Sequence, residues 1–204
     1  MIGENSQDDD RYIPGENLEF LVVGLNHRTA PVEIRERLAL NKEQLPEALS
    51  AMTRHGMTGV ILSTCNRSEF YVLDTPGAKP GESSNMPLNG FGNGFGNGSE
   101  TGNGSQNDAA APNQDCADRV KQFLVERFGI SLLDVDRYLY VYRGYDCIHH
   151  LFRVSSSLDS MILGEEQIIG QVRDAYEAAT NAGTAQGPLA QLFQQALRVG
   201  RRVR

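Results

Sequence analysis

Short runs of apolar and β-branched residues mark the strands of this chain. Leu18–Leu25 reads LEFLVVGL, which predicts a buried strand. Two further strands are predicted at Gly59–Leu62 and Glu69–Leu73, and the alternation over Tyr138–Tyr142 predicts a fourth. Because antiparallel connections are available between these strands, the pattern favours a small, mostly antiparallel sheet.

Helical spacing, with its start and stop signals, accounts for much of the remaining chain. Asn41 with Gln44 resembles a capping box, and the helix that it opens would run to about His55, with Gly56 as its stop. Pro46 falls within the first turns of that helix and favours a later start.

The second half of the chain is predicted to be mainly helical. Asp115 can cap a helix that Gly129 ends, and a short helix begins at Asp146. Apolar positions predict a helix from Gly164 to about Asn181, and Gly187-Pro188 starts a last amphipathic helix. Strands followed by helices indicate an α+β fold, in which the small sheet packs with helices and C-terminal helices follow.

Composition separates folded from unfolded parts. Residues 1–17 are acidic, and residues 75–115 are rich in Gly, Asn, Ser and Pro, so both segments are predicted to be disordered. The insertion at 75–115 has neither G-x-x-x-x-G-K nor G-x-G-x-x-G spacing, which disfavours a phosphate-binding loop. The rest is predicted to form one domain over residues 18–182 and a further helix over residues 183–204.

The net charge of −7 lies mainly in the two unfolded segments. Outside residues 1–19 and 75–115, 16 acidic residues face 17 basic ones. Four arginines form a basic end of the chain: Arg198, Arg201, Arg202 and Arg204. Since phosphate binding depends largely on Lys and Arg, the charge permits a nucleic-acid partner without demanding one.

The sequence lacks the features of secreted and membrane proteins. The N-terminus has no basic and apolar signal regions, and no segment supplies about 18 uninterrupted apolar residues. We therefore expect a cytoplasmic protein that makes no membrane contact. In a reducing compartment the three cysteines, Cys65, Cys116 and Cys147, do not predict disulfides.

The segment Ser63-Thr64-Cys65-Asn66-Arg67 is the strongest candidate for chemistry. It places a thiol on the connection between two predicted strands, with a guanidinium two residues away. A thiolate attacks acyl carbonyls, and a fixed arginine can fork onto a substrate carboxylate. The alternative is a structural cysteine at a strand end with Arg67 in solvent.

His150 is the next candidate, as a proton donor to a leaving oxygen. It would lie one helical turn from Asp146, which could orient it; the alternative is a surface histidine without a catalytic role. Cys147, His149 and His150 do not predict a metal site, because adjacent helical residues point about 100° apart.

A polar stretch follows this helix. Ser155–Ser160 leads into Leu163–Gln167, where polar side chains and free backbone amides at a helix start can form an anion or carboxylate pocket. Helix capping explains most of these residues equally well. The local residues therefore indicate a thiol acyl-transfer site, but they do not identify its substrate.

Three blocks together resemble glutamyl-tRNA reductases. They read GLNHRTAPVEIRERLAL at Gly24–Leu40, STCNRSEFY at Ser63–Tyr71 and HLFRVSSSLDSMILGEEQIIGQVRDAY at His150–Tyr176. Their order and approximate spacing match the family, and with the final helix they cover most of the chain outside the acidic N-terminus and the insertion.

The resemblance implies NADPH-dependent reduction of glutamyl-tRNA(Glu) to glutamate-1-semialdehyde, the first step of 5-aminolevulinate and tetrapyrrole biosynthesis. It implies that Cys65 forms a glutamyl thioester, that His150 is the activity-critical histidine, and that residues 18–182 are the catalytic domain. The substrate contacts that it implies are Thr64, Asn66, Arg67, Ser160, Glu165, Glu166, Gln167 and Gln171. At Glu166 many family members have Pro.

The resemblance also implies parts that this sequence does not contain. Family members continue into an NADPH-binding domain and a dimerisation domain, and residues 183–204 would lead toward the first of these. No Gly-rich dinucleotide fingerprint occurs here, so we do not expect NADPH to bind this chain. We also expect no metal, because the candidate ligands lack the usual spacing. The implied partners are glutamyl-tRNA(Glu), a second copy in a homodimer, and a glutamate-1-semialdehyde aminomutase that receives the product.

Three other interpretations remain open. The chain could be an incomplete fragment that at most forms the thioester and loses it to water. It could instead be a non-catalytic RNA- or protein-binding module, although joint retention of Cys65, Arg67 and His150 argues against that. A metal-binding regulatory domain is the least favoured.

Overall fold

A computed structural model describes residues 18–74, 115–160 and 167–203 of the chain. The disorder predicted for residues 1–17 and for most of the insertion lies outside the described residues, as do Glu165 and Glu166.

A four-stranded antiparallel sheet forms the centre of the fold. Its strands have the order β2-β3-β1-β4, and every neighbouring pair is antiparallel. The bounds are β1 (Glu19–Asn26), β2 (Gly59–Ser63), β3 (Arg67–Asp74) and β4 (Tyr140–Arg143). All four predicted strands are therefore present, although β4 starts two residues later than predicted.

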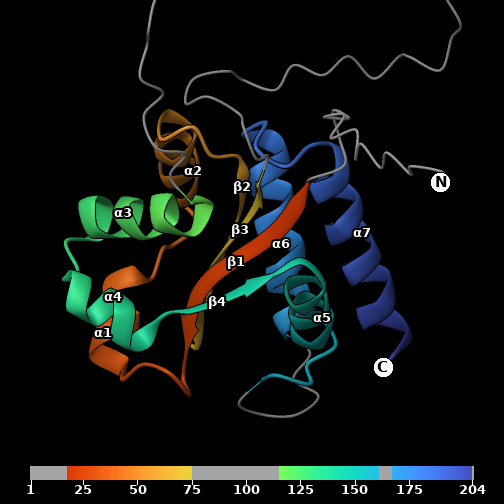
Figure 1. The fold of residues 1–204 in the computed structure, drawn as a ribbon. Helices are drawn as coiled ribbons and strands as arrows, with labels where there is room; N and C mark the ends of the chain where they lie inside the picture. Colours follow the sequence, from red (N-terminus) through yellow and green to blue (C-terminus); the bar gives the residue numbers. More distant parts are fainter. Residues whose placement is uncertain (1–17, 75–114, 161–166, 204) are drawn as a thin grey trace, which may run out of the picture.

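Helices cover both faces of the sheet, and the predicted α+β class is confirmed. Figure 1 shows α1 to α4 on one side of the sheet and α5 to α7 on the other. The bounds are α1 (Val32–Leu38), α2 (Leu45–Arg54), α3 (Cys116–Phe128), α4 (Leu132–Tyr138), α5 (Gly144–Ser155), α6 (Gln167–Asn181) and α7 (Gly187–Arg202). Within the described residues, no helix is long and apolar enough to cross a membrane.

The predicted helix boundaries are largely confirmed by their caps. The Asn41 side chain accepts from the Gln44 N–H at 2.9 Å, and the Gln44 side chain accepts from the Asn41 N–H at 3.0 Å, so the capping box forms. Helix α2 then begins at Leu45, with Pro46 in its first turn. Asp115 caps α3, although it was also counted with the disordered insertion.

Two short helices, α1 and α4, were not predicted. Each has seven residues, about two turns, which is too short for apolar periodicity to stand out. Helix α1 follows Pro31 without a side-chain cap, so it has no start signal in the sequence. Helix α4 extends through Tyr138, which explains the later start of β4.

The alternation of side chains along β3 decides where the charged groups of the sheet lie. Phe70 meets Phe123 and Phe128 of α3, on the side of the first helix group. Tyr71 meets Phe193 of α7 on the opposite side, and with period two Arg67 and Glu69 share its face. The face toward α5 to α7 therefore carries both the apolar core and a charged cluster.

Candidate functional site

Cys65 lies at the tip of the turn that joins β2 to β3. The Thr64 N–H donates to the Arg67 carbonyl at 2.8 Å, and the Thr64 hydroxyl oxygen accepts from the N–H groups of Asn66 and Arg67, both at 3.1 Å. These bonds fix the turn through its own residues. The Cys65 thiol is free and exposed.

Two neighbouring segments hold this turn from outside. The His27 N–H donates to the Asn66 carbonyl at 2.9 Å. The Arg35 guanidinium of α1 donates to the Cys65 carbonyl and lies 3.5 Å from the Asn66 side-chain oxygen. The unpredicted helix α1 therefore contributes directly to the position of Cys65.

Arg67 lies within the protein and not in solvent. Its side chain is 2% exposed, and its Nη1 donates to Glu69 Oε1 at 2.7 Å. Its Nη2 donates to the carbonyl of Asp159 and lies 3.3 Å from the carboxylate of that residue. The interpretation of Arg67 as a solvated residue at a strand end is therefore wrong, since both ends of its guanidinium meet buried acceptors.

Glu69 is the centre of the buried charged cluster. Its side chain is fully buried, and four groups reach its two oxygens. These are Arg67 Nη1, His150 Nε2 and the Tyr140 hydroxyl at Oε1, and the Tyr71 hydroxyl at Oε2. A buried carboxylate requires such partners, because an unpaired charge is costly in an apolar interior.

The cluster fixes the ionisation state of its members. Burial acts to raise the pKa of Glu69, but the Arg67 charge and the His150 hydrogen bond outweigh it and lower this pKa to about 2. Burial and the Glu69 charge both raise the pKa of Tyr71 and of Tyr140 well above the usual value. At neutral pH the carboxylate is therefore charged and both phenols keep their protons.

His150 comes from α5 and is buried against the same carboxylate. Its Nε2 lies 2.9 Å from Glu69 Oε1, and its ring packs against those of Tyr140 and Tyr142, with centroids 5.4 and 5.0 Å away. Asp146 was predicted to orient this histidine. That prediction is wrong, because Asp146 faces solvent while the ring faces the sheet.

The residues after α5 close the cluster from the other side. Asp159 is 5% exposed and accepts from Arg28 Nη1 at 2.8 Å as well as from Arg67. Ser160, predicted as a substrate contact, is also buried, and it accepts from the Ser157 hydroxyl at 3.3 Å. The backbone of Ser157 has φ of 62°, the left-handed region, so this loop turns sharply beside the cluster.

The structure brings together some predicted site residues and separates others. The turn at Thr64–Arg67 and His150 meet through the Arg67–Glu69 pair. Ser160 directly follows Asp159, which contacts Arg67, but its own printed partner is Ser157. Gln167 is exposed and Gln171 half-buried, one turn apart at the start of the described part of α6. The predicted anion pocket at the start of that helix lies outside the described residues, so it stays a prediction.

Several residues that form the cluster or hold the Cys65 turn were not predicted. They are Arg28, Arg35, Glu69, Tyr71, Tyr140 and Asp159. A signal for two of them was present in the sequence, because Glu69 and Tyr71 alternate along the predicted strand Glu69–Leu73, two and four residues after Arg67. Charged side chains on the same face of such a strand require buried partners.

The other two cysteines lie away from solvent. Cys116 and Cys147 are buried, and burial raises the pKa of the Cys116 thiol to about 11. Burial and the nearby Glu69 charge also raise the pKa of Cys147. Among the described residues, no group of three or more His, Cys, Asp or Glu side chains could hold a metal ion.

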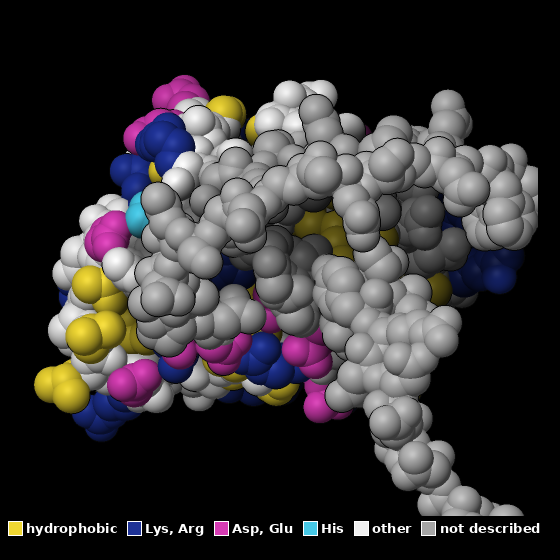
Figure 2. Space-filling view, turned by 45° about the horizontal axis from the view of Figure 1, so that its top comes forward, with side chains coloured by type: hydrophobic (Ala, Val, Ile, Leu, Met, Phe, Trp, Pro, Cys, Tyr) yellow, Lys and Arg dark blue, Asp and Glu magenta, His cyan; other side chains and the backbone are white. Residues whose placement is uncertain are grey.

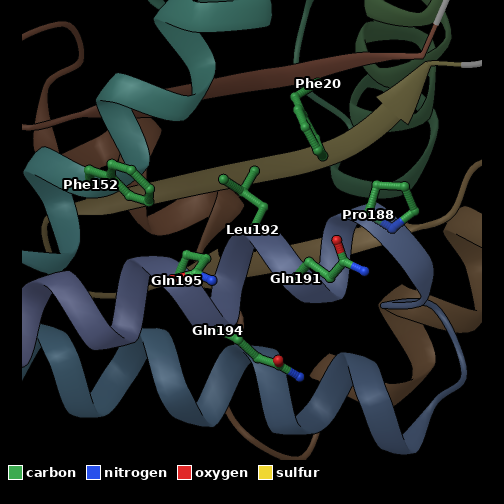
Figure 3. A pocket seen from close by; sticks show the side chains of 7 residues that line it. All are labelled: Phe20, Phe152, Pro188, Gln191, Leu192, Gln194 and Gln195. Carbon is green, nitrogen blue, oxygen red and sulfur yellow. The ribbon is translucent and has the colours of Figure 1, made fainter. Parts of the chain in front are cut away.

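A hollow beside α7 is lined by side chains that are less reactive than those of the cluster. The hollow, of about 410 Å³, lies where Figure 3 shows Phe20 of β1 and Leu192 of α7 facing one another. The rest of its lining is Phe152, Pro188, Gln191, Gln194 and Gln195, so it has no titratable side chain. Where the face in Figure 2 is not grey, acidic and basic side chains mix along its lower edge.

A family model and the sequences of known proteins match this chain to the same family. The family model described as glutamyl-tRNAGlu reductase, N-terminal domain, matches residues 23–204. The glutamyl-tRNA reductases of Carboxydothermus hydrogenoformans and Heliobacterium mobile are each 42% identical to this chain, and each match covers 91% of this chain and 34% of the relative. The chain thus spans about a third of the length of these relatives.

A solved structure shows a similar fold. The glutamyl-tRNA reductase from Methanopyrus kandleri matches with a TM-score of 0.55 and 24% identity, over 90% of this chain and 34% of that chain.

Proposed function

Because this chain belongs to the glutamyl-tRNA reductase family and matches its N-terminal domain, we propose that it is the catalytic module of such an enzyme. The enzyme would reduce glutamyl-tRNA(Glu) to glutamate-1-semialdehyde with NADPH, at the entry to 5-aminolevulinate and tetrapyrrole biosynthesis. The step that we assign to this module is capture of the glutamyl group on Cys65.

The exposure of Cys65 is the observation that supports this proposal most directly. Of the three thiols, it alone is exposed, on a turn whose backbone is held by its own hydrogen bonds. An acyl group on a tRNA can reach a thiol there, whereas Cys116 and Cys147 are buried. Attack by the thiolate forms a C–S bond and a tetrahedral intermediate.

Collapse of that intermediate releases the tRNA. The ester C–O bond breaks, the ribose oxygen leaves and takes up a proton, and a glutamyl thioester remains on Cys65. We assign delivery of this proton to His150, which lies in the same cluster as the turn that carries the thiol. On this proposal, the turn after β2 supplies the nucleophile and α5 supplies the proton donor.

The side chains around Cys65 are proposed to hold the substrate. The Arg67 guanidinium is 2% exposed and bound to Glu69 and Asp159, so its proposed contact with the substrate rests on family membership. The further substrate contacts are proposed from family membership. They are Thr64, Asn66, Ser160, Glu165, Glu166, Gln167 and Gln171.

NADPH does not fit the described residues. A dinucleotide fold needs parallel strands with a Gly-rich turn into a helix, and the four described strands are all antiparallel. We therefore assign to NADPH no reaction step of this module. The reduction of the thioester is assigned to the enzyme as a whole.

Two further partners are proposed from family membership alone. They are a second copy of the enzyme in a homodimer and an aminomutase that accepts glutamate-1-semialdehyde.

Acyl capture can be tested directly on this chain. Incubation with glutamyl-tRNA(Glu), followed by an acid quench and intact-mass measurement, should give a mass increase of one glutamyl group. Cys65→Ser should abolish it, while Cys116→Ala should retain it as the matched control. Hydroxylamine should remove the group, as expected for a thioester. An absent adduct, or one that survives Cys65→Ser, would refute the proposal.

A further inference from the structure

Glu69 connects two residues of the site that come from different elements. One of its oxygens, Oε1, meets both Arg67 of β3 and His150 of α5, at 2.7 and 2.9 Å. The Tyr140 hydroxyl of β4 reaches the same oxygen at 2.5 Å. A single carboxylate oxygen therefore joins the strand that follows Cys65 to the helix that carries the proton donor.

The chemistry of these partners fixes the direction of the hydrogen bond with His150. An ionised carboxylate only accepts, and its pKa of about 2 keeps Glu69 ionised at neutral pH. Arg67 and the two protonated phenols act as donors toward it. The contact at His150 Nε2 therefore requires a proton on that nitrogen.

The surroundings of His150 oppose a rotation of its ring. A half-turn would replace Nε2 by a ring carbon at Glu69 and break the hydrogen bond. Tyr140 and Tyr142 of β4 pack against the ring, and the side chain is 9% exposed. With Nε2 held, Nδ1 is the ring nitrogen that remains for exchange with a substrate.

The carboxylates beside His150 already have other charged partners. Glu69 is paired with Arg67, and Asp159 is paired with Arg67, with Arg28 and, at 4.0 Å, with Arg153. Neither carboxylate therefore depends on a charged imidazole. A neutral ring with its proton on Nε2 has a free lone pair on Nδ1, which can take a proton from a thiol before it returns one to a leaving oxygen.

We propose that Glu69 is a positioning residue that holds His150 with its proton on Nε2, so that His150 exchanges protons with the reacting groups through Nδ1. The structural half of this inference, the proton on Nε2, is drawn from the cluster alone. The catalytic half, proton exchange through Nδ1, rests on the function proposed above. Glu69 is buried and paired, so it acts only through its neighbours.

The structural half can be tested by NMR of the 204-residue chain with ¹⁵N-labelled histidine. The chain has four histidines, and a His150→Gln variant assigns the signals of His150. At neutral pH we expect the Nε2–H form, with a proton that exchanges slowly with water. A wild-type His150 that carries its proton on Nδ1 would overturn the inference, whatever the enzyme does.

Variants at the carboxylate and beside it separate positioning from general stability. Glu69→Gln keeps the shape but removes the charge, so the Nε2–H resonance should move and its exchange should speed up. Tyr140→Phe removes one donor to the same oxygen and should leave the proton on Nε2. If both variants leave the His150 signals unchanged, Glu69 does not position the ring.

The catalytic half is tested by the rate of adduct formation. With glutamyl-tRNA(Glu) as substrate, Glu69→Gln should slow formation of the Cys65 adduct on the order of 10²-fold, the lower end for general acid–base catalysis. Circular dichroism of Glu69→Gln at neutral pH should match that of the wild type, which shows that the slower reaction is not a loss of fold. Equal adduct rates would overturn the catalytic half, while an absence of adduct in the wild type would count against the proposed function instead.

Discussion

Gly24 of β1 lies directly opposite Glu69 of β3, and a Cβ added to Gly24 would come within 2.8 Å of Glu69 Cγ. The same Cβ would also lie 2.9 Å from the carbonyl oxygen of Ser68, which belongs to the backbone and cannot turn away. The sheet therefore leaves room for the Glu69 side chain by omitting one from the neighbouring strand.

Gly24→Ala should therefore destabilise the protein, by about 1–3 kcal/mol, as expected for overpacking. It should also move Glu69 and with it His150. Urea denaturation gives the free energy of unfolding, and the His150 NMR signals report the movement.

Gly170→Ala is the matched control for this substitution. Gly170 lies in α6, and a Cβ there would have nothing within 4 Å. Alanine should stabilise the helix by roughly 0.5–1 kcal/mol. If the two alanine variants have the same stability, the contact between Gly24 and Glu69 does not constrain the sheet.

Arg67→Met should be strongly destabilising. It would remove the cation between two buried carboxylates, Glu69 and Asp159, and broken buried pairs typically cost about 3–5 kcal/mol. The measurement is the urea midpoint, with circular dichroism to show whether the variant folds at all.

Arg28→Met provides the comparison, since Arg28 pairs with Asp159 but its own side chain is 55% exposed. Surface ion pairs contribute about 0–1 kcal/mol, so this variant should stay close to the wild type. Equal losses at Arg28 and Arg67 would show that burial of Arg67 does not determine its contribution.

Local signals in the sequence were sufficient for the sheet and most helices. The strand at Leu18–Leu25 and the cap at Asp115 could be predicted because each depends on its own neighbours. The partner of His150 could not be predicted in the same way, because Glu69 lies 81 residues earlier and meets it only after β3 and α5 pack together. Asp146 was nearer in sequence but faces solvent.

The lowered pKa of Glu69 predicts how the free energy of unfolding depends on pH. The folded-state pKa of Glu69 is lowered from 4.5 to about 2, so its contribution to stability is fully present above pH 4.5 and is lost as the pH falls toward 2. The free energy of unfolding should therefore drop over that window. Glu69→Gln should be less stable above the window and should show a shallower drop within it.

Asp115→Asn is the control for this acid dependence. Asp115 also has a lowered pKa, first through its hydrogen bond with Arg143, but it lies at the surface, and asparagine retains helix capping. Its acid profile should follow the wild type closely. A Glu69→Gln profile parallel to the wild type would show that another group causes the acid loss.

The three thiols should differ in reactivity. Under native conditions near neutral pH, iodoacetamide should modify Cys65 at least about tenfold faster than Cys116 or Cys147, because only Cys65 is exposed and burial raises the pKa of the other two. Peptide mapping by mass spectrometry after short exposures gives the three rates. In denaturant the rates should converge, which serves as the control for intrinsic reactivity. Three equally slow thiols in the folded chain would instead favour a binding module that has lost the reaction, because an acyl-capturing cysteine must be open to its substrate.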